Sequence, residues 1–110
     1  MNSTVIDLEN FREGASKVFT SRVRGINVCH SSKIDSLELI SDKITIKIPK
    51  DICSINPSFF EGFLCNVITK LKKEGFKNKF SFVNEGEYKI ETDLNEGIYR
   101  ILKNKDVWQN

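Results

Sequence analysis

The sequence lacks the features that identify secreted, membrane-spanning and metal-binding proteins. No apolar stretch approaches the roughly 18 residues of a membrane-spanning helix. The opening MNSTVIDLENFREG has no basic segment followed by an apolar run, so we expect no secretory signal. Cysteine is scarce: Cys29, Cys53 and Cys65 fit neither a disulfide framework nor a metal site. We therefore expect a cytoplasmic protein with reduced thiols and no contact with a membrane.

Strong net charge and an evident catalytic group are also missing. The formal net charge is +2, from 17 Lys and Arg against 15 Asp and Glu, which is too weak a field to favour nucleic acid or membranes. His30 is the single histidine, and its neighbour Cys29 would point about 100° away from it on a helix. Gly14, Gly25 and Gly62 are isolated, so no phosphate-binding loop is present. These absences predict a protein that is not an enzyme and holds no metal or cofactor.

Strands and helices are predicted to alternate along a single domain spanning residues 1–110. This length supports one hydrophobic core. The clearest strand is KITIKIP, in which isoleucine alternates with Lys and Thr from residue 43 to residue 48. The order predicts an α/β layered domain in which part of the sheet is parallel. The expected elements are strands at 5–8, 43–48, 76–84 and 87–92, and helices within 24–40, from 57 to about 74, and at 94–103.

The segment INPSFFEG, residues 55–62, predicts a helix start. Pro57 suits the first helical position, where its missing N–H would be unpaired, and Asn56 is a good N-cap. A start slightly later would use Ser58 and Glu61 as a capping box. Gly75 is the expected end of this helix.

Ser58 is the candidate switch of the chain. A hydroxyl at a helix start faces unpaired backbone N–H groups, so a phosphate on Ser58 would be well accommodated and would add nearly two negative charges. The simpler alternative is that Ser58 only caps the helix. Arg22 and Arg24, beside Gly25, could grip a carboxylate or a phosphate.

Five lysines gather near the end of the same predicted helix. They could contact an acidic partner or nucleic acid. The alternative is a solvated surface that complements the helix dipole, because Glu74 interrupts the run and no arginine is interleaved. These lysines are Lys70, Lys72, Lys73, Lys77 and Lys79.

The stretch from ITIKIP to FSFVN, preceded by SRVRG, resembles the STAS-like family of bacterial and phage-borne domains, which are related to anti-sigma-factor antagonists. The similarity covers roughly residues 5–103, and its most specific element is the pair Ser58 and Phe59. The resemblance implies a small α/β sandwich, with a mixed sheet and helices packed mainly on one face. It implies a regulatory module whose partner is a kinase of the histidine-kinase-like ATPase fold. It also implies Ser58 as the phosphoacceptor, although Asn56 and Pro57 replace the acidic pattern of the regulated antagonists.

The sequence as a whole favours a non-enzymatic module that binds a protein through residues 54–62. Phe59 is expected to be an exposed anchor on the helix face opposite Phe60. One alternative is a nucleic-acid-binding protein that uses the Lys70–Lys79 patch, although nucleic acid is the less favoured partner. Another is a phage defence or counter-defence inhibitor that binds a larger complex. A third is a small-molecule sensor that holds an anion near Arg22. The expected partner-binding residues are Asn56, Phe59, Glu61, Arg22 and Arg24.

Overall fold

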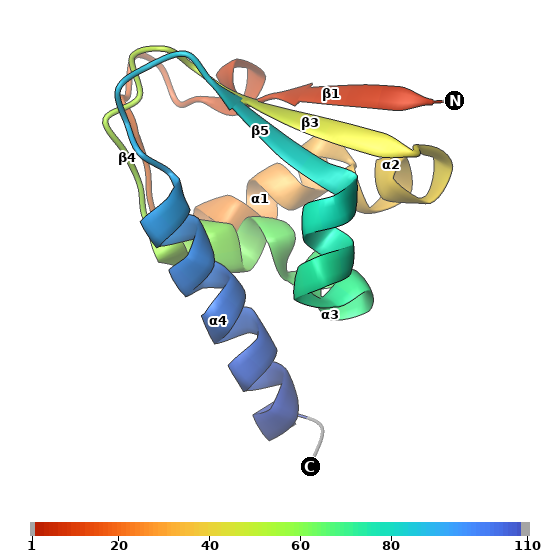
Figure 1. The fold of residues 1–110 in the computed structure, drawn as a ribbon. Coiled ribbons are helices and arrows are strands. Elements are labelled where there is room, and N and C mark those ends of the chain that lie inside the picture. Colours follow the sequence, from red (N-terminus) through yellow and green to blue (C-terminus); the bar gives the residue numbers. More distant parts are fainter. Residues whose placement is uncertain (1, 109–110) are drawn as a thin grey trace.

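The chain folds into two layers, with a sheet on one side and the α-helices on the other (Figure 1). The computed structural model describes the backbone of residues 2–108 and the side chains of residues 2–103. The α/β class and the placement of helices on one face of the sheet are confirmed. The elements are β1 (Ser3–Asp7), a 3-10 helix (Leu8–Phe11), β2 (Val18–Phe19), α1 (Arg22–Ser32), α2 (Ile34–Ile40), β3 (Lys43–Ile48), β4 (Ser54–Ile55), α3 (Pro57–Lys79), β5 (Phe80–Asn84) and α4 (Glu91–Trp108).

The main sheet has the strand order β1-β3-β5, and both of its pairings are parallel. A second, two-stranded sheet pairs β2 with β4, again in parallel. The expected mixed sheet is therefore wrong for the described residues. The physical reason is that α1 and α2 lie between β1 and β3 in the chain, and α3 lies between β3 and β5. Each helical connection carries the chain back to the end of the sheet where the previous strand began, so the next strand runs in the same direction.

The predicted alternation in β3 is confirmed. Ile44, Ile46 and Ile48 are buried against the helices, while Lys43 and Lys47 are exposed on the other face. That outer face carries no other layer among the described residues (Figure 1).

The predicted strand at 87–92 is wrong, because the chain leaves the sheet after Asn84. The Asn84 side-chain amide donates to the backbone carbonyl of Tyr88, which closes a turn. The Tyr88 hydroxyl lies 2.6 Å from a carboxylate oxygen of Asp93 and 3.0 Å from the carbonyl of Ile55, so two acceptors share its one proton, and the segment is tied to β4. Helix α4 begins three residues later, at Glu91.

Helix α3 breaks at Lys72 rather than ending at Gly75. Lys72 has φ 64° and ψ 179°, and helical turns resume after it and continue to Lys79. The expected strand at 76–84 therefore begins only at Phe80. Phe76 is buried on the helical side of this junction, and its ring stacks on that of Phe80 with centroids 4.7 Å apart.

The predicted helix within 24–40 is two helices. Lys33, in the left-handed conformation with φ 58°, ends α1 and starts α2. The N-terminal strand is Ser3–Asp7 rather than 5–8, and Leu8 lies in the 3-10 helix that follows it.

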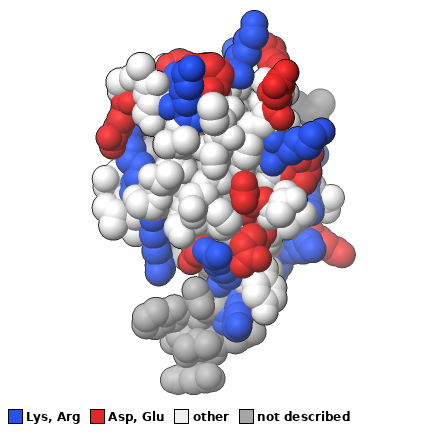
Figure 2. All heavy atoms as spheres, turned by 90° about the vertical axis from the view of Figure 1, so that its left-hand side faces the viewer, with Lys and Arg blue, Asp and Glu red and all other residues white. Residues whose placement is uncertain are grey.

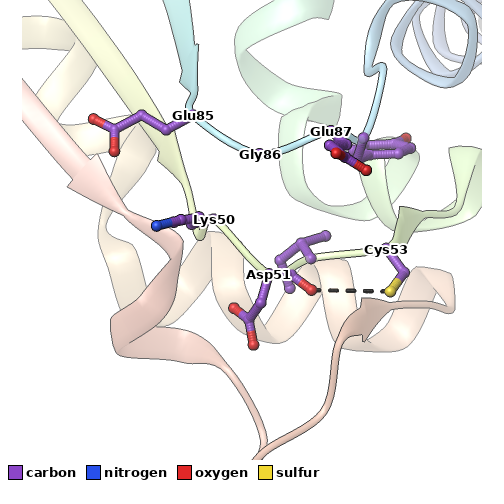
Figure 3. A pocket seen from close by; sticks show the side chains of 8 residues that line it. Lys50, Asp51, Cys53, Glu85, Gly86 and Glu87 are labelled. Atoms are coloured by element: carbon purple, nitrogen blue, oxygen red, sulfur yellow. Dashed lines mark hydrogen bonds between the residues drawn. The ribbon is translucent and has the colours of Figure 1, made fainter.

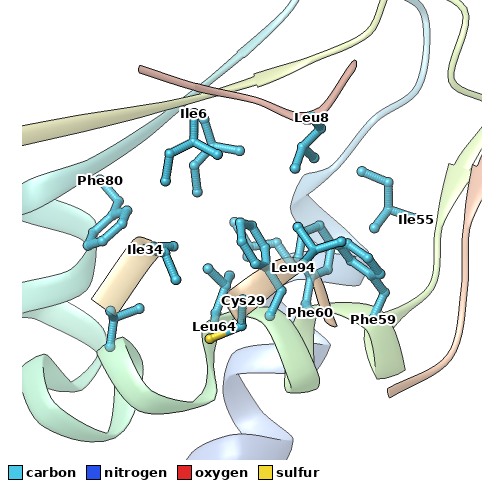
Figure 4. Packing of buried hydrophobic residues seen from close by; sticks show 14 of the residues in the cluster. Ile6, Leu8, Cys29, Ile34, Ile55, Phe59, Phe60, Leu64, Phe80 and Leu94 are labelled. Atoms are coloured by element: carbon cyan, nitrogen blue, oxygen red, sulfur yellow. The ribbon is translucent and has the colours of Figure 1, made fainter. Parts of the chain in front are cut away.

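Aromatic and aliphatic side chains fill the space between the sheet and the helices (Figure 4). Phe59, Phe60 and Phe63 of α3 are completely buried there. Ile6 and Phe80 reach the same core from β1 and β5. Helix α3 packs against both α1 and α4, so it is the central helix of the layer.

Candidate functional site

Helices α1 and α3 start side by side because each follows one strand of the β2–β4 pair. The backbone N–H of Asn56 donates to the carbonyl of Phe19, 2.9 Å away, which ties the ends of the two strands together. Gly25 and Gly62 then let the helices approach closely. A Cβ on Gly62 would lie 2.1 Å from the backbone oxygen of Arg22, and one on Gly25 would lie 2.2 Å from that of Phe59.

The predicted start of α3 is confirmed. Asn56 is the N-cap, and its side-chain oxygen accepts from the Ser58 N–H at 2.8 Å, with Pro57 in the first turn. Ser58 itself does not cap the helix, so the capping-box alternative is wrong. The Ser58 hydroxyl is half-buried and makes no hydrogen bond to another described residue. The cap of α3 therefore does not use the Ser58 hydroxyl.

Phe59 is not the exposed anchor that the sequence suggested. Its side chain is 0% exposed, and its ring lies 5.0 Å from that of Phe19 and 5.7 Å from that of Phe63. The face of α3 opposite Phe60 is covered by α1, so both aromatic side chains of the pair belong to the core. Phe59 is a structural residue.

Glu61 binds α4 rather than pointing freely into solvent. Its carboxylate lies 3.3 Å from Nη1 of Arg100, whose Nε also binds Glu96 at 2.9 Å. Gly97 lies where α4 meets the first turn of α3, since a Cβ there would be 3.3 Å from the carbonyl of Pro57. Glu61 thus joins α4 to α3 one turn after Ser58.

The two candidate arginines differ in how firmly they are held. Arg24 donates to the backbone carbonyl of Phe11, and its Nε lies 3.1 Å from Glu13. Arg22, in the first turn of α1, is exposed and has no ion pair among the described side chains. Ser21 caps this helix, accepting from the Arg24 N–H at 3.0 Å with an unusual φ of 73°. Arg22 is therefore the arginine that is free to meet a partner.

Figure 1 shows α1, α3 and α4 all starting on its left-hand side, and Figure 2 looks directly at that side. Charges of both signs are interspersed there around uncharged surface, with no basic or acidic field. We define the helix-start surface as the exposed or half-buried residues Arg22, Asn56 and Ser58, with Glu61 at its margin.

An open pocket of about 860 Å³ lies above this surface, between the loop after β3 and the loop after β5 (Figure 3). Gly86 lets the loops meet, because a Cβ there would lie 2.1 Å from the carbonyl of Lys50. The exposed Cys53 lines the pocket, with its thiol 3.9 Å from the carbonyl of Asp51. Glu85 and Glu87 border it from the second loop.

Sequence reasoning did not single out the ion pair beside this pocket. Arg12, only 7% exposed, donates from its two terminal nitrogens to the two carboxylate oxygens of Asp51, at 3.0 and 2.5 Å. These hydrogen bonds lower the pKa of Asp51 to about 2. Burial, together with a hydrogen bond to Asp93, raises the pKa of Tyr88, so this phenol stays neutral. A pairing between residues 39 positions apart leaves no local pattern by which it could have been found.

The thiol of Cys29 and the imidazole of His30, near the C-terminal end of α1, do not form a nucleophile and base. His30 is exposed, whereas Cys29 is buried and donates to Asp35 at 3.7 Å. Burial raises the pKa of the Cys29 thiol to about 12, with the carboxylate of Asp35 adding to the effect. The thiolate that nucleophilic chemistry needs is therefore disfavoured.

The five lysines near the end of α3 do not form one patch. Lys70 and Lys79 both bind the carboxylate of Glu38, at 2.7 Å each, and the Glu38 side chain is only 5% exposed. Lys77 instead faces α4, where its Nζ lies 3.3 Å from Asn95. The division of these charges between two faces does not favour a continuous track for nucleic acid.

No protein-family model, curated protein or solved structure matches the chain. Within residues 2–108 no helix has the length and apolar character needed to cross a membrane. Side chains of His, Cys, Asp and Glu do not gather in threes as a potential metal site in the described part of the chain. The helix-start surface and the pocket above it are thus the candidate sites.

Proposed function

We propose that this chain is a non-enzymatic regulatory module that binds a partner protein through the helix-start surface and is switched by phosphorylation of Ser58. One observation carries the proposal: Asn56 caps α3, which leaves the half-buried Ser58 hydroxyl unengaged at the positive end of the central helix. The resemblance of INPSFFEG and its surroundings to the STAS-like family supports the same reading, with a kinase of the histidine-kinase-like ATPase fold as the partner class.

The helix start favours a phosphate on Ser58. Ser58 lies in the first turn of α3, where backbone N–H groups and the helix dipole stabilise negative charge by about 0.3–1 kcal/mol. Arg22 starts the adjacent helix, and Arg100 lies at Glu61, one turn further along α3. A phosphate would therefore change the charge of the helix-start surface without unfolding the helix.

The test is quantitative capture of partners from the native host, followed by mass spectrometry. The immobilised chains are the unchanged protein, Ser58→Glu, Arg22→Ala and, as a matched control, Ser36→Glu, since Ser36 is an exposed serine in the first turn of α2. We expect one protein to be retained by the unchanged chain and the control and to be lost from both helix-start variants. Retention of the same proteins by all four chains would contradict the proposal.

Mass spectrometry of the chain isolated from its host tests the switch directly. The expected result is a phosphopeptide that carries the phosphate on Ser58. If Ser58 is unmodified under all growth conditions, the proposed phosphorylation is refuted. If partner binding is still lost in Ser58→Glu, the proposed docking surface stands without the switch.

A further inference from the structure

A second surface lies between α4 and the part of α3 that follows the break at Lys72. It is a groove of about 390 Å³ whose lining is mainly apolar. None of its lining residues belongs to the helix-start surface, although Gly97, next to Ile98, contacts the first turn of α3. The lining residues are Lys73, Asn95, Ile98, Tyr99, Leu102 and Lys103.

The apolar part of the groove comes from one face of α4. Ile98 is buried, Leu102 is partly buried, and the Tyr99 side chain is 59% exposed at the rim. The rest of the apolar face of α4 is packed against the protein, so this highly exposed tyrosine is available to contact a partner. The groove therefore has an apolar floor and an aromatic wall.

The rim of the groove is basic. Lys73 and Lys103 line it, and Lys77 approaches from α3 through its contact with Asn95. The ammonium of Lys103 lies over the Tyr99 ring, 5.6 Å from its centroid. Among the side chains that the structure describes, none that lines the groove carries a carboxylate. These lysines differ from Lys70 and Lys79, whose charges Glu38 offsets on the other side of α3.

We propose that this groove binds an acidic amphipathic helix of a partner protein. A groove between two helices accepts a third helix through apolar residues spaced three and four apart. The lysines on the rim select a helix that is flanked by Asp or Glu, because opposite charges across an interface favour one partner over others. The small number of lysines and the apolar floor fit such a helix better than a nucleic acid, which needs an extended basic surface.

The probe is a labelled helical peptide of about 16 residues, with Leu at the contact spacing and Glu at most other positions. Two comparison peptides have the same composition in scrambled order, or Lys in place of Glu. Fluorescence anisotropy measures binding to the full chain, and chemical-shift changes in NMR spectra locate it. We expect the acidic amphipathic peptide alone to bind, with the largest shifts at Ile98, Tyr99 and Leu102, and more weakly as salt rises.

Charge reversal at the rim separates groove binding from general attraction. The double variant Lys73→Glu with Lys103→Glu should weaken binding of the acidic peptide at least tenfold. The control, Lys47→Glu with Lys89→Glu, makes the same charge change at two exposed lysines outside the groove and should leave the affinity within twofold. Tyr99→Ala, at an exposed position, should weaken binding at least fivefold.

Several outcomes would overturn the proposal. These are equal binding of the scrambled or basic peptide, equal effects of the two double variants, or no binding of the acidic peptide up to millimolar concentration. Binding of duplex DNA or of anionic lipid vesicles that is lost in Lys73→Glu with Lys103→Glu, without peptide binding, would assign the groove to those ligands instead. The peptide test does not involve Ser58, so its failure and that of the proposed function are distinguishable.

Discussion

Substituting Gly62 with alanine should separate the two helices whose starts form the candidate site. The new Cβ would lie 2.1 Å from the backbone oxygen of Arg22 and 2.7 Å from the backbone nitrogen of Ile26. Since the shortest comfortable carbon–oxygen distance is about 3.3 Å, α1 must move away from α3 by about 1 Å. Neither clashing atom can rotate away, because both belong to the backbone of α1.

The energy follows from two opposing effects. Overpacking typically costs about 1–3 kcal/mol, and a backbone clash belongs at the upper end of that range. Alanine in place of glycine within a helix returns about 1 kcal/mol. We expect Gly62→Ala to lower the free energy of unfolding by about 2 kcal/mol.

Gly75→Ala is the matched control. This glycine also lies in α3, but a Cβ there would meet only the side chain of Leu71, at 3.1 Å. The control should therefore change stability by less than about 1 kcal/mol, in the stabilising direction if Leu71 adjusts. Urea denaturation followed by circular dichroism gives both values, with unchanged slopes as the check on comparable unfolding. A Gly62→Ala protein within about 0.5 kcal/mol of the unchanged chain would refute the close contact of α1 and α3.

Three further predictions concern the backbone, the acid pH range and the core. Lys72→Gly should raise the free energy of unfolding by about 1 kcal/mol, because φ 64° with ψ 179° is a conformation that glycine adopts without strain; thermal denaturation measures it. The hydrogen bonds from Arg12 lower the folded-state pKa of Asp51 to about 2, below its unfolded-state pKa of about 3.9. The stabilisation from this pair is thus present above about pH 5 and declines as the pH falls through about 2. Asp51→Asn should therefore flatten the acid side of a plot of unfolding free energy against pH. An unchanged slope in that variant would contradict the pairing. Phe59→Ala should cost about 3–5 kcal/mol in urea denaturation, as expected for a fully buried phenylalanine, whereas an exposed anchor would cost almost nothing.

The sequence predicted those elements whose signals are local. The alternation of isoleucine in residues 43–48 and the Asn-Pro start of α3 each depend on neighbours in the chain, and both are confirmed. The break at Lys72 could not be predicted, because a lysine stands where glycine would be expected and Gly75 offered a plausible end nearby.

The candidate site depended more on distant contacts. A single apolar stripe on a helix predicts a single covered face, which leaves Phe59 on the surface, whereas α3 is covered by the sheet, by α1 and by α4. The division of the lysines arises from Glu38, 32 residues before Lys70. Burial and pairing of this kind depend on which elements meet, and a single sequence does not specify that.

Photochemical cross-linking from position 58 tests the central claim most directly. A photoreactive amino acid replaces Ser58 in one chain and the exposed Ser81, on the open face of the sheet, in the control. In the native host, the account predicts one discrete cross-linked protein from position 58 and no such product from position 81. The same products from both positions, or none from position 58, would contradict a partner-binding role for the helix-start surface.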